Sequence, residues 1–181
     1  NTVTYDGKSH GENGYTVTNL AAGDQVKTVA IAGTATDAGT YKDQLVPSNA
    51  KIVNAAGEDV TAGYEIEYKA GTLTITKRAV TLTSESDTKP YDGKALTKDT
   101  VTVSGDGFAD GEGATYTVTG SQTLVGSSKN TFSYKLNDNT KAGNYTITTT
   151  EGTLEVTNRG LAGEKVTITE TDNTVTDEGK Y

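Results

Sequence analysis

Three carboxylates, Asp106, Asp110 and Glu112, stand close together in the segment Asp-Gly-Phe-Ala-Asp-Gly-Glu at residues 106–112. Calcium binds six to eight oxygen atoms, and a loop of this kind could supply several of them. We therefore treat these three residues as a candidate calcium loop and expect no other cofactor. The spacing does not follow the EF-hand pattern, and the corresponding stretch of an earlier repeat, residues 18–24, keeps only one carboxylate.

Other reactions find less support in the sequence. Glycoside hydrolysis needs two carboxylates held about 5–10 Å apart in a cleft, and although Asp and Glu number 24, no pattern pairs any two of them. A Lys–Asn amide cross-link shared by the repeats is not supported, because Asn158 at the end of one copy is replaced by Lys77 in the other. We expect a protein that is not an enzyme.

The residue types that are missing narrow the chemistry further. The chain has no Cys, which excludes thiol catalysis, disulfides and zinc ribbons, and its one histidine, His10, makes a His-based triad or a multi-His metal site untenable. We expect His10 to be a solvated loop residue near a turn. A net charge of −8 argues against nucleic acid as a partner. No apolar run approaches the roughly 18 residues of a membrane span.

The elements that must position these residues are predicted to be strands. Of 181 residues, 35 are Thr and 10 are Tyr, both of which favour strands. Apolar residues alternate with Thr in several short segments, which indicates strands with one buried face and one face in water; these segments are residues 15–18, 73–76, 116–119 and 146–148. Gly, Asn and Asp clusters separate them, as in a β-sandwich or barrel.

The chain also repeats itself. Tyr-Asp-Gly-Lys at residues 5–8 returns at residues 91–94, and Gly-Thr-Leu-Thr-Ile-Thr-Lys-Arg at residues 71–78 is matched by Gly-Thr-Leu-Glu-Val-Thr-Asn-Arg at residues 152–159. A further start is visible where Val-Thr-Ile-Thr at residues 166–169 matches Val-Thr-Leu-Thr at residues 80–83. Self-similarity at a fixed spacing is the signature of a tandem array. We expect the sequence to have been cut from a longer one.

These observations predict an all-β protein made of two tandem immunoglobulin-like β-sandwich repeats and the first strand of a third. The predicted divisions are residues 1–82, residues 83–165, and a third-repeat start or linker strand at residues 166–181. A β-grasp or other mixed sheet remains the alternative fold. Tight two-residue hairpins are expected at Glu151-Gly152 and Ala70-Gly71. We expect the strand at residues 166–181 to pair either with the second repeat or with a neighbouring molecule, because an unpaired edge invites strand addition.

The repeated Tyr-Asp-Gly-Lys motif has a structural and a functional interpretation. The favoured one is an Asp-Gly turn with Tyr packed beneath it and Lys in solvent, since a tandem array needs the same joint at every boundary. The alternative is a loop that reads a ligand. The tyrosines divide in the same way: we expect most of them to fill the edge of the core, and exposed ones could stack on sugars.

The chain resembles the MBG-type tandem β-repeat of large Gram-positive bacterial surface proteins and adhesins. The resemblance rests on the Tyr-Asp-Gly-Lys opening, the Ser-Gln-Thr-Leu-Val-Gly segment at residues 121–126, the Ala-Gly-Asn-Tyr strand at residues 142–145 and the ending at residues 71–78, and it covers residues 1–159. It implies an extracellular, cell-wall-associated location. The first copy departs from it at residues 34–39, and the third start has Asp-Glu-Gly in place of Tyr-Asp-Gly.

Together these features lead us to expect a non-catalytic stalk or spacer, whose repeats project a binding head from the cell wall and have neighbouring repeats of the same chain as partners. Quasi-linear arrays whose copies touch only their neighbours suit that role. Two alternatives stay open. The repeats could themselves bind host mucin glycans or matrix protein by avidity, or they could be accessory modules of a secreted carbohydrate-active enzyme.

Overall fold

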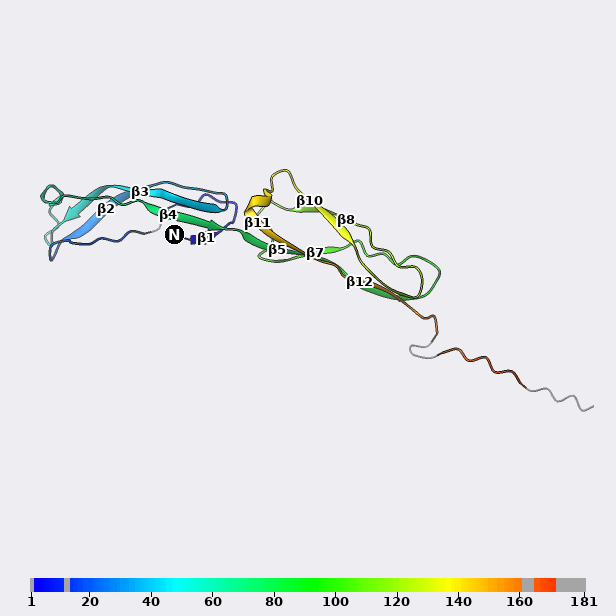
Figure 1. Cartoon of the computed structure of the whole chain (residues 1–181). Helices are drawn as coiled ribbons and strands as arrows, with labels where there is room; N and C mark the ends of the chain where they lie inside the picture. Colours follow the sequence, from blue (N-terminus) through cyan, green and yellow to red (C-terminus); the bar gives the residue numbers. More distant parts are fainter. Residues whose placement is uncertain (1, 12–13, 161–164, 172–181) are drawn as a thin grey trace, which may run out of the picture.

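The computed structural model describes residues 2–11, 14–160 and 165–171. Within these residues the chain is all-β, as predicted, and its only helical turns are two short 3-10 helices, η1 (Thr61–Gly63) and η2 (Ala142–Asn144). Figure 1 shows two groups of strands placed end to end in an elongated molecule. Across the described ranges no helix has the length and apolar composition needed to cross a membrane.

The first repeat contains one four-stranded sheet with the order β1-β4-β3-β2. Its strands are β1 (Thr2–Thr4), β2 (Gln25–Ala32), β3 (Gly39–Val53) and β4 (Gly71–Thr76). The start of β3 pairs with β4 and the remainder pairs with β2, and both pairings contain register shifts. These irregularities coincide with positive φ angles of 53° at Asp43 and 51° at Asn49, so β3 bends and serves two partners.

The second repeat divides its strands among three small sheets, with the orders β11-β5-β7, β6-β12-β9 and β10-β8. The strands are β5 (Arg78–Ser84), β6 (Asp87–Pro90), β7 (Val101–Gly105), β8 (Ala114–Val118), β9 (Gly126–Lys129), β10 (Phe132–Leu136), β11 (Tyr145–Thr150) and β12 (Thr153–Thr157). The predicted boundary at residue 82 falls inside β5, which pairs on both sides with strands of the second repeat.

Equivalent strands of the two copies pair in the same register. β1 runs parallel to β4 just as β6 runs parallel to β12. Gly39 lies opposite Ile75 in the first copy, and Gly126 lies opposite Val156 in the second. The start of β3 therefore corresponds to β9, and β2 with the rest of β3 corresponds to the pair formed by β8 and β10.

Two groups of sequence predictions were wrong. The hairpin expected at Glu151-Gly152 does not form, because β11 pairs with β5 while β12 pairs with β6 and β9 in another sheet. The chain continues in one direction through this two-residue link, whose Gly152 amide donates to the Ser84 hydroxyl at 3.0 Å. The alternation of apolar and polar residues predicts a strand but not the strand with which it pairs. The same pattern therefore fits two strands of one hairpin and two consecutive strands that belong to different sheets.

In the first copy, residues 15–18 are not in a strand, although the alternation predicted one. Residues 64–69, the first arm of the hairpin predicted at Ala70-Gly71, are not in a strand either, so that hairpin is absent as well. The strand predicted for residues 166–181 is likewise absent from residues 166–171, and the rest of that prediction lies outside the described residues. These segments have the strand pattern without a paired neighbour, and a strand needs both.

The main hydrophobic core runs from one repeat into the other. Its buried members include Leu45, Leu73 and Ile75 of the first repeat and Val80 and Leu82 of the second. A smaller cluster in the second repeat contains the buried residues Leu96, Leu154 and Val156. Because the larger cluster crosses the boundary, separating the repeats would expose apolar surface, which costs about 25 cal/mol per Å².

Candidate functional site: the junction between the repeats

The two repeats meet at a junction with a one-residue linker. β4 ends at Thr76 and β5 begins at Arg78, so Lys77 alone separates the last strand of one repeat from the first strand of the next. The end of β1 is tied to the same place, because the Tyr5 amide donates to the Thr76 carbonyl at 2.9 Å. A one-residue link leaves the repeats little freedom to reorient, so side chains on both sides face each other in a fixed arrangement.

Aromatic rings fill the centre of the junction. Tyr5 of the first repeat is only 3% exposed, and its ring meets that of Tyr145 edge-on, with centroids 5.5 Å apart and an interplanar angle of 82°. Phe108 packs against the other side of Tyr145 at 5.2 Å. Edge-to-face pairs contribute about 0.5–1.5 kcal/mol beyond the area they bury. The rings thus join the two repeats through apolar contact.

One carboxylate binds both tyrosines. The Tyr5 hydroxyl donates to Glu112 Oε1 at 2.5 Å and the Tyr145 hydroxyl donates to Glu112 Oε2 at 2.6 Å. Burial, together with the bond to Glu112, raises the pKa of Tyr5 to about 12, and the same causes raise the pKa of Tyr145 to about 12. Glu112 therefore satisfies two buried hydroxyls that come from different repeats, and both phenols remain protonated well above neutral pH.

A second polar contact joins the edge of the junction. Lys141 Nζ lies 2.7 Å from Asp37 Oδ2, and Asn144 donates to Asp37 Oδ1 at 3.0 Å. Asn144 also accepts a hydrogen bond of 2.8 Å from the Ala38 amide and is itself buried. The hydrogen bond from Lys141, supported by that from Asn144, holds the pKa of Asp37 below its usual value.

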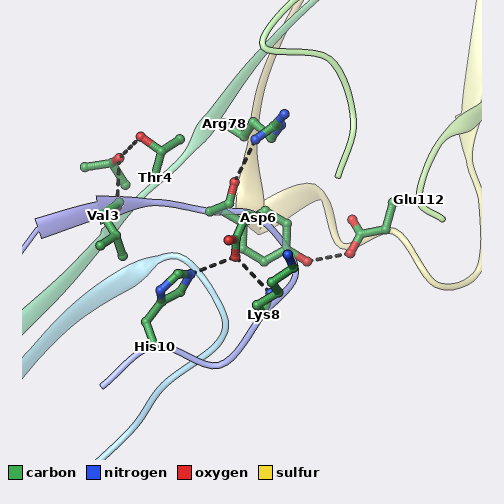
Figure 2. Close-up of polar contacts among 9 residues, drawn as sticks. Val3, Thr4, Asp6, Lys8, His10, Arg78 and Glu112 are labelled. Carbon is green, nitrogen blue, oxygen red and sulfur yellow. Dashed lines mark hydrogen bonds and ion pairs between the residues drawn. The ribbon is translucent and has the colours of Figure 1, made fainter. Parts of the chain in front are cut away.

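Arg78 fixes the loop that follows β7. Its guanidinium donates to the carbonyl oxygens of Gly107 at 2.8 Å, Asp106 at 2.6 Å and Tyr5 at 3.3 Å. Figure 2 shows Arg78 and Glu112 reaching toward the segment that follows β1 from two different directions. A planar guanidinium that spans three carbonyl groups sets an orientation that the single point charge of lysine cannot reproduce.

The repeated Tyr-Asp-Gly-Lys motif forms the predicted turn. Asp6 Oδ1 accepts the Lys8 amide at 2.9 Å, Gly7 has a φ of +80°, and Tyr5 is buried while Lys8 is exposed. The second copy has the same geometry, with the Lys94 amide donating to Asp92 Oδ1 at 2.9 Å. The structural interpretation of the motif is confirmed.

The environment predicted for His10 was wrong. Its Nε2 lies 2.7 Å from Asp6 Oδ1 (Figure 2), and its backbone forms an isolated bridge with Ala35. The side chain is 24% exposed and paired rather than freely solvated. The pKa of Asp6 is lowered by the Lys8 amide and by the His10 side chain, so this pair stabilises the turn that delivers Tyr5.

The three carboxylates of the candidate calcium loop lie beside the junction, and two of them have protein partners. Glu112 accepts the two tyrosine hydroxyls, and Asp106 Oδ2 accepts the Ala79 amide at 3.2 Å. In the part of the chain that the structure describes, no three His, Asp or Glu side chains are grouped as a metal site would require. The calcium loop of Asp106, Asp110 and Glu112 stays a prediction from the sequence.

Sequence reasoning missed the outer contact of Asp37, Lys141 and Asn144. One signal was available: the Ala-Gly-Tyr segment of the first copy becomes Ala-Gly-Asn-Tyr in the second, and the added residue is Asn144. The arrangement as a whole can hold two repeats in one orientation through packing, charge and hydrogen bonds. No family model, curated protein or solved structure matches this chain.

Proposed function

We propose that the two repeats act as a rigid, non-catalytic spacer within an extracellular bacterial surface protein, where they hold a binding head away from the cell wall. The observation that carries the proposal is the junction, in which Glu112 joins Tyr5 of one repeat to Tyr145 of the next. A spacer transmits length only if its repeats cannot fold back on one another, and a continuous core with fixed polar contacts supplies that resistance.

The surface chemistry agrees with this role. The net charge of −8 keeps neighbouring copies apart at close range, and Thr-rich strand faces keep the repeats hydrated. The resemblance to MBG-type repeats of Gram-positive adhesins supports the extracellular, cell-wall-associated setting, and it rests on the turn and strand motifs quoted above. Neighbouring repeats of the same chain are the partners that the spacer needs.

Direct adhesion by the repeats is the alternative, and one observation bears on it. Exposed tyrosines that recur at equivalent places in both copies would form a repeated sugar-binding surface. Among the residues that the structure describes, the exposed tyrosines are Tyr15, Tyr68 and Tyr134. In the other copy Val101 and Thr149 stand at the places of Tyr15 and Tyr68, and Tyr134 corresponds to the bulge of β3 at residues 49–50, so the aromatic surface does not repeat. This difference favours the spacer.

Binding of the chain to arrayed mucin glycans and matrix proteins separates the two functions. The chain should be presented multivalently, with and without calcium, because weak contacts become visible through avidity. The spacer proposal expects no saturable binding under either condition. Saturable and selective binding that weakens in Tyr15→Ala or Tyr68→Ala would overturn it in favour of adhesion, and Lys27→Ala on an exposed face serves as the matched control.

A further inference from the structure

The first repeat has an open groove where the second repeat holds a strand. In the second repeat β5 lies between β11, to which it is parallel, and β7, to which it is antiparallel. Its inward side chains Val80 and Leu82 are 1% and 0% exposed. β5 thus closes one side of the core of the second repeat.

The counterparts of β7 and β11 in the first repeat are residues 15–19 and 64–69. The first assignment is supported by backbone geometry, because Asn19 and Gly105 end their segments with φ angles of 63° and 76°. Neither segment is part of a strand, and the two border a groove of about 1040 Å³. Side chains that line it include Tyr15, Val26, Ile31, Leu45, Ile52 and Ile66.

A glycine marks the end of this groove. A Cβ at Gly152 would come within 2.5 Å of the Ser84 carbonyl oxygen and 2.6 Å of Glu85, so β5 requires glycine there. The equivalent residue of the first repeat is Gly71, whose Cβ would meet only Leu45, at 3.7 Å or more. The first repeat keeps the glycine that a neighbouring strand demands, although no described residue occupies that place.

We propose that this groove is a strand receptor and that residues 165–170 of a second copy of the chain occupy it, parallel to residues 64–69. Val-Thr-Ile-Thr at residues 166–169 matches Val-Thr-Leu-Thr of β5. Val166 and Ile168 are 86% and 91% exposed. A period of two places both on one face of a strand, where they would enter the groove as Val80 and Leu82 enter the second repeat.

The donor segment lies far from the groove of its own chain. Figure 1 shows residues 165–171 leaving the far end of the second repeat, while the groove belongs to the first. Exchange between copies would therefore bury the exposed apolar side chains of residues 165–170 and fill the open groove of the first repeat. Each contact joins different surfaces of the two copies, so repeated exchange builds a head-to-tail row, or a ring where the rotation between copies closes. This proposed exchange does not depend on the spacer function proposed above.

One position of the donor departs from β5. Ser84 is 1% exposed, and its hydroxyl donates to the Asn130 carbonyl at 2.5 Å and accepts the Gly152 amide at 3.0 Å. Glu170 stands at the equivalent place in the donor. A carboxylate is larger and costs more to bury than a hydroxyl. The wild-type exchange should therefore be weak, and Glu170→Ser should strengthen it.

Register-specific disulfide trapping tests the proposal on the intact chain, which has no cysteine of its own. In β5, Thr81 lies opposite Thr148 of β11, and the matching donor and acceptor residues are Thr167 and Glu67. A mixture of Thr167→Cys and Glu67→Cys chains should give a covalent heterodimer. Thr167→Cys mixed with Asp99→Cys, an exposed site on the second repeat, is the matched control.

The proposal expects the heterodimer yield to exceed the control several-fold and to rise in a Glu170→Ser background. Equal yields in the two mixtures, or no heterodimer at the highest soluble concentration, would overturn it. Oligosaccharide that protects the Glu67→Cys chain from labelling, with no heterodimer formed, would instead assign the groove to sugar and would equally overturn it.

Substitutions that leave the fold intact give an independent test by sedimentation. Val166→Asp and Ile168→Asp change exposed residues and should each weaken association about tenfold or more, because an apolar side chain is lost from the buried face. Gly71→Ala has room in the unoccupied groove and should leave the circular dichroism spectrum unchanged while weakening association by a similar factor. Association unchanged in all three variants would contradict the proposal.

Discussion

At the scale of single residues, Glu112 and the two hydroxyls that it binds hold the junction together. Tyr5→Phe removes one hydroxyl and should lower the free energy of unfolding by about 1–2 kcal/mol, because hydrogen bonds to charged groups are among the stronger ones. Tyr134→Phe, at an exposed site, is the matched control and should change little. Urea denaturation measures both.

The coupling between these residues can be measured as well. In a double-mutant cycle, Tyr5→Phe and Glu112→Gln should be non-additive by about 0.5 kcal/mol or more, because they share one contact. Effects that simply add would mean that the 2.5 Å contact between Tyr5 and Glu112 contributes nothing to stability.

High pH should weaken the junction. The pKa values of Tyr5 and Tyr145 are raised from 10.0 to about 12, so in this range the folded chain retains protons that the unfolded chain has lost. Stability from these groups is therefore fully present below pH 10 and is lost as the pH rises toward 12. Near-ultraviolet titration should show phenols that ionise late, and Tyr5→Phe should remove one. Uniform titration near pH 10 would contradict the buried arrangement.

Low pH should act on the outer contact. The hydrogen bond from Lys141 lowers the pKa of Asp37, so its stabilising effect is present above the usual aspartate range near pH 3.9 and is lost as the pH falls through the lowered value. Lys141→Gln should make the unfolding midpoint less dependent on pH in this window. Because the pair is largely exposed, added salt should reduce the difference. An unaltered pH profile would mean that the pair does not form in solution.

At the scale of elements, β5 passes close beside Gly152 in the second repeat. Gly152→Ala would place a methyl group within 2.5 Å of backbone atoms, so we expect a loss of about 2 kcal/mol or more in unfolding free energy. Gly71→Ala is the matched control in the other copy and should change little in dilute solution. Equal losses at both glycines would contradict the difference between the repeats.

The sequence predicted strands better than their partners. Alternation of apolar residues with Thr located β4, β8 and β11, and the Asp-Gly pair located the turn after Tyr5. Pairing could not be predicted, because it depends on which distant segment lies alongside. Residues 15–18 have the same alternation and are not a strand.

The candidate site could be predicted only in part, for the same reason. Glu112 was singled out as a calcium ligand, since local spacing of carboxylates is visible in a sequence. Its two hydroxyl donors could not be seen there, because Tyr5 lies 107 residues away along the chain. Arg78 is the last residue of the repeated segment at residues 71–78, but its hydrogen bonds to the carbonyl groups of Asp106 and Gly107 could not be predicted, because they depend on the fold.

At the scale of the whole molecule, we expect the two repeats to hold one relative orientation. A distance distribution between spin labels, one on each repeat, measures this orientation. The absence of native cysteine allows labels at Lys27→Cys and Lys135→Cys, both exposed strand positions. Dilute samples labelled in this way report on the junction within one chain.

We expect a single narrow distribution at neutral pH that broadens when Tyr5→Ala and Glu112→Ala are combined, because the aromatic contact and its carboxylate are then both lost. Val125→Ala, at an exposed site away from the junction, should leave the distribution unchanged. A broad or multimodal distribution in the otherwise unmodified chain would show that the repeats are flexibly linked, and such repeats could not act as a rigid spacer.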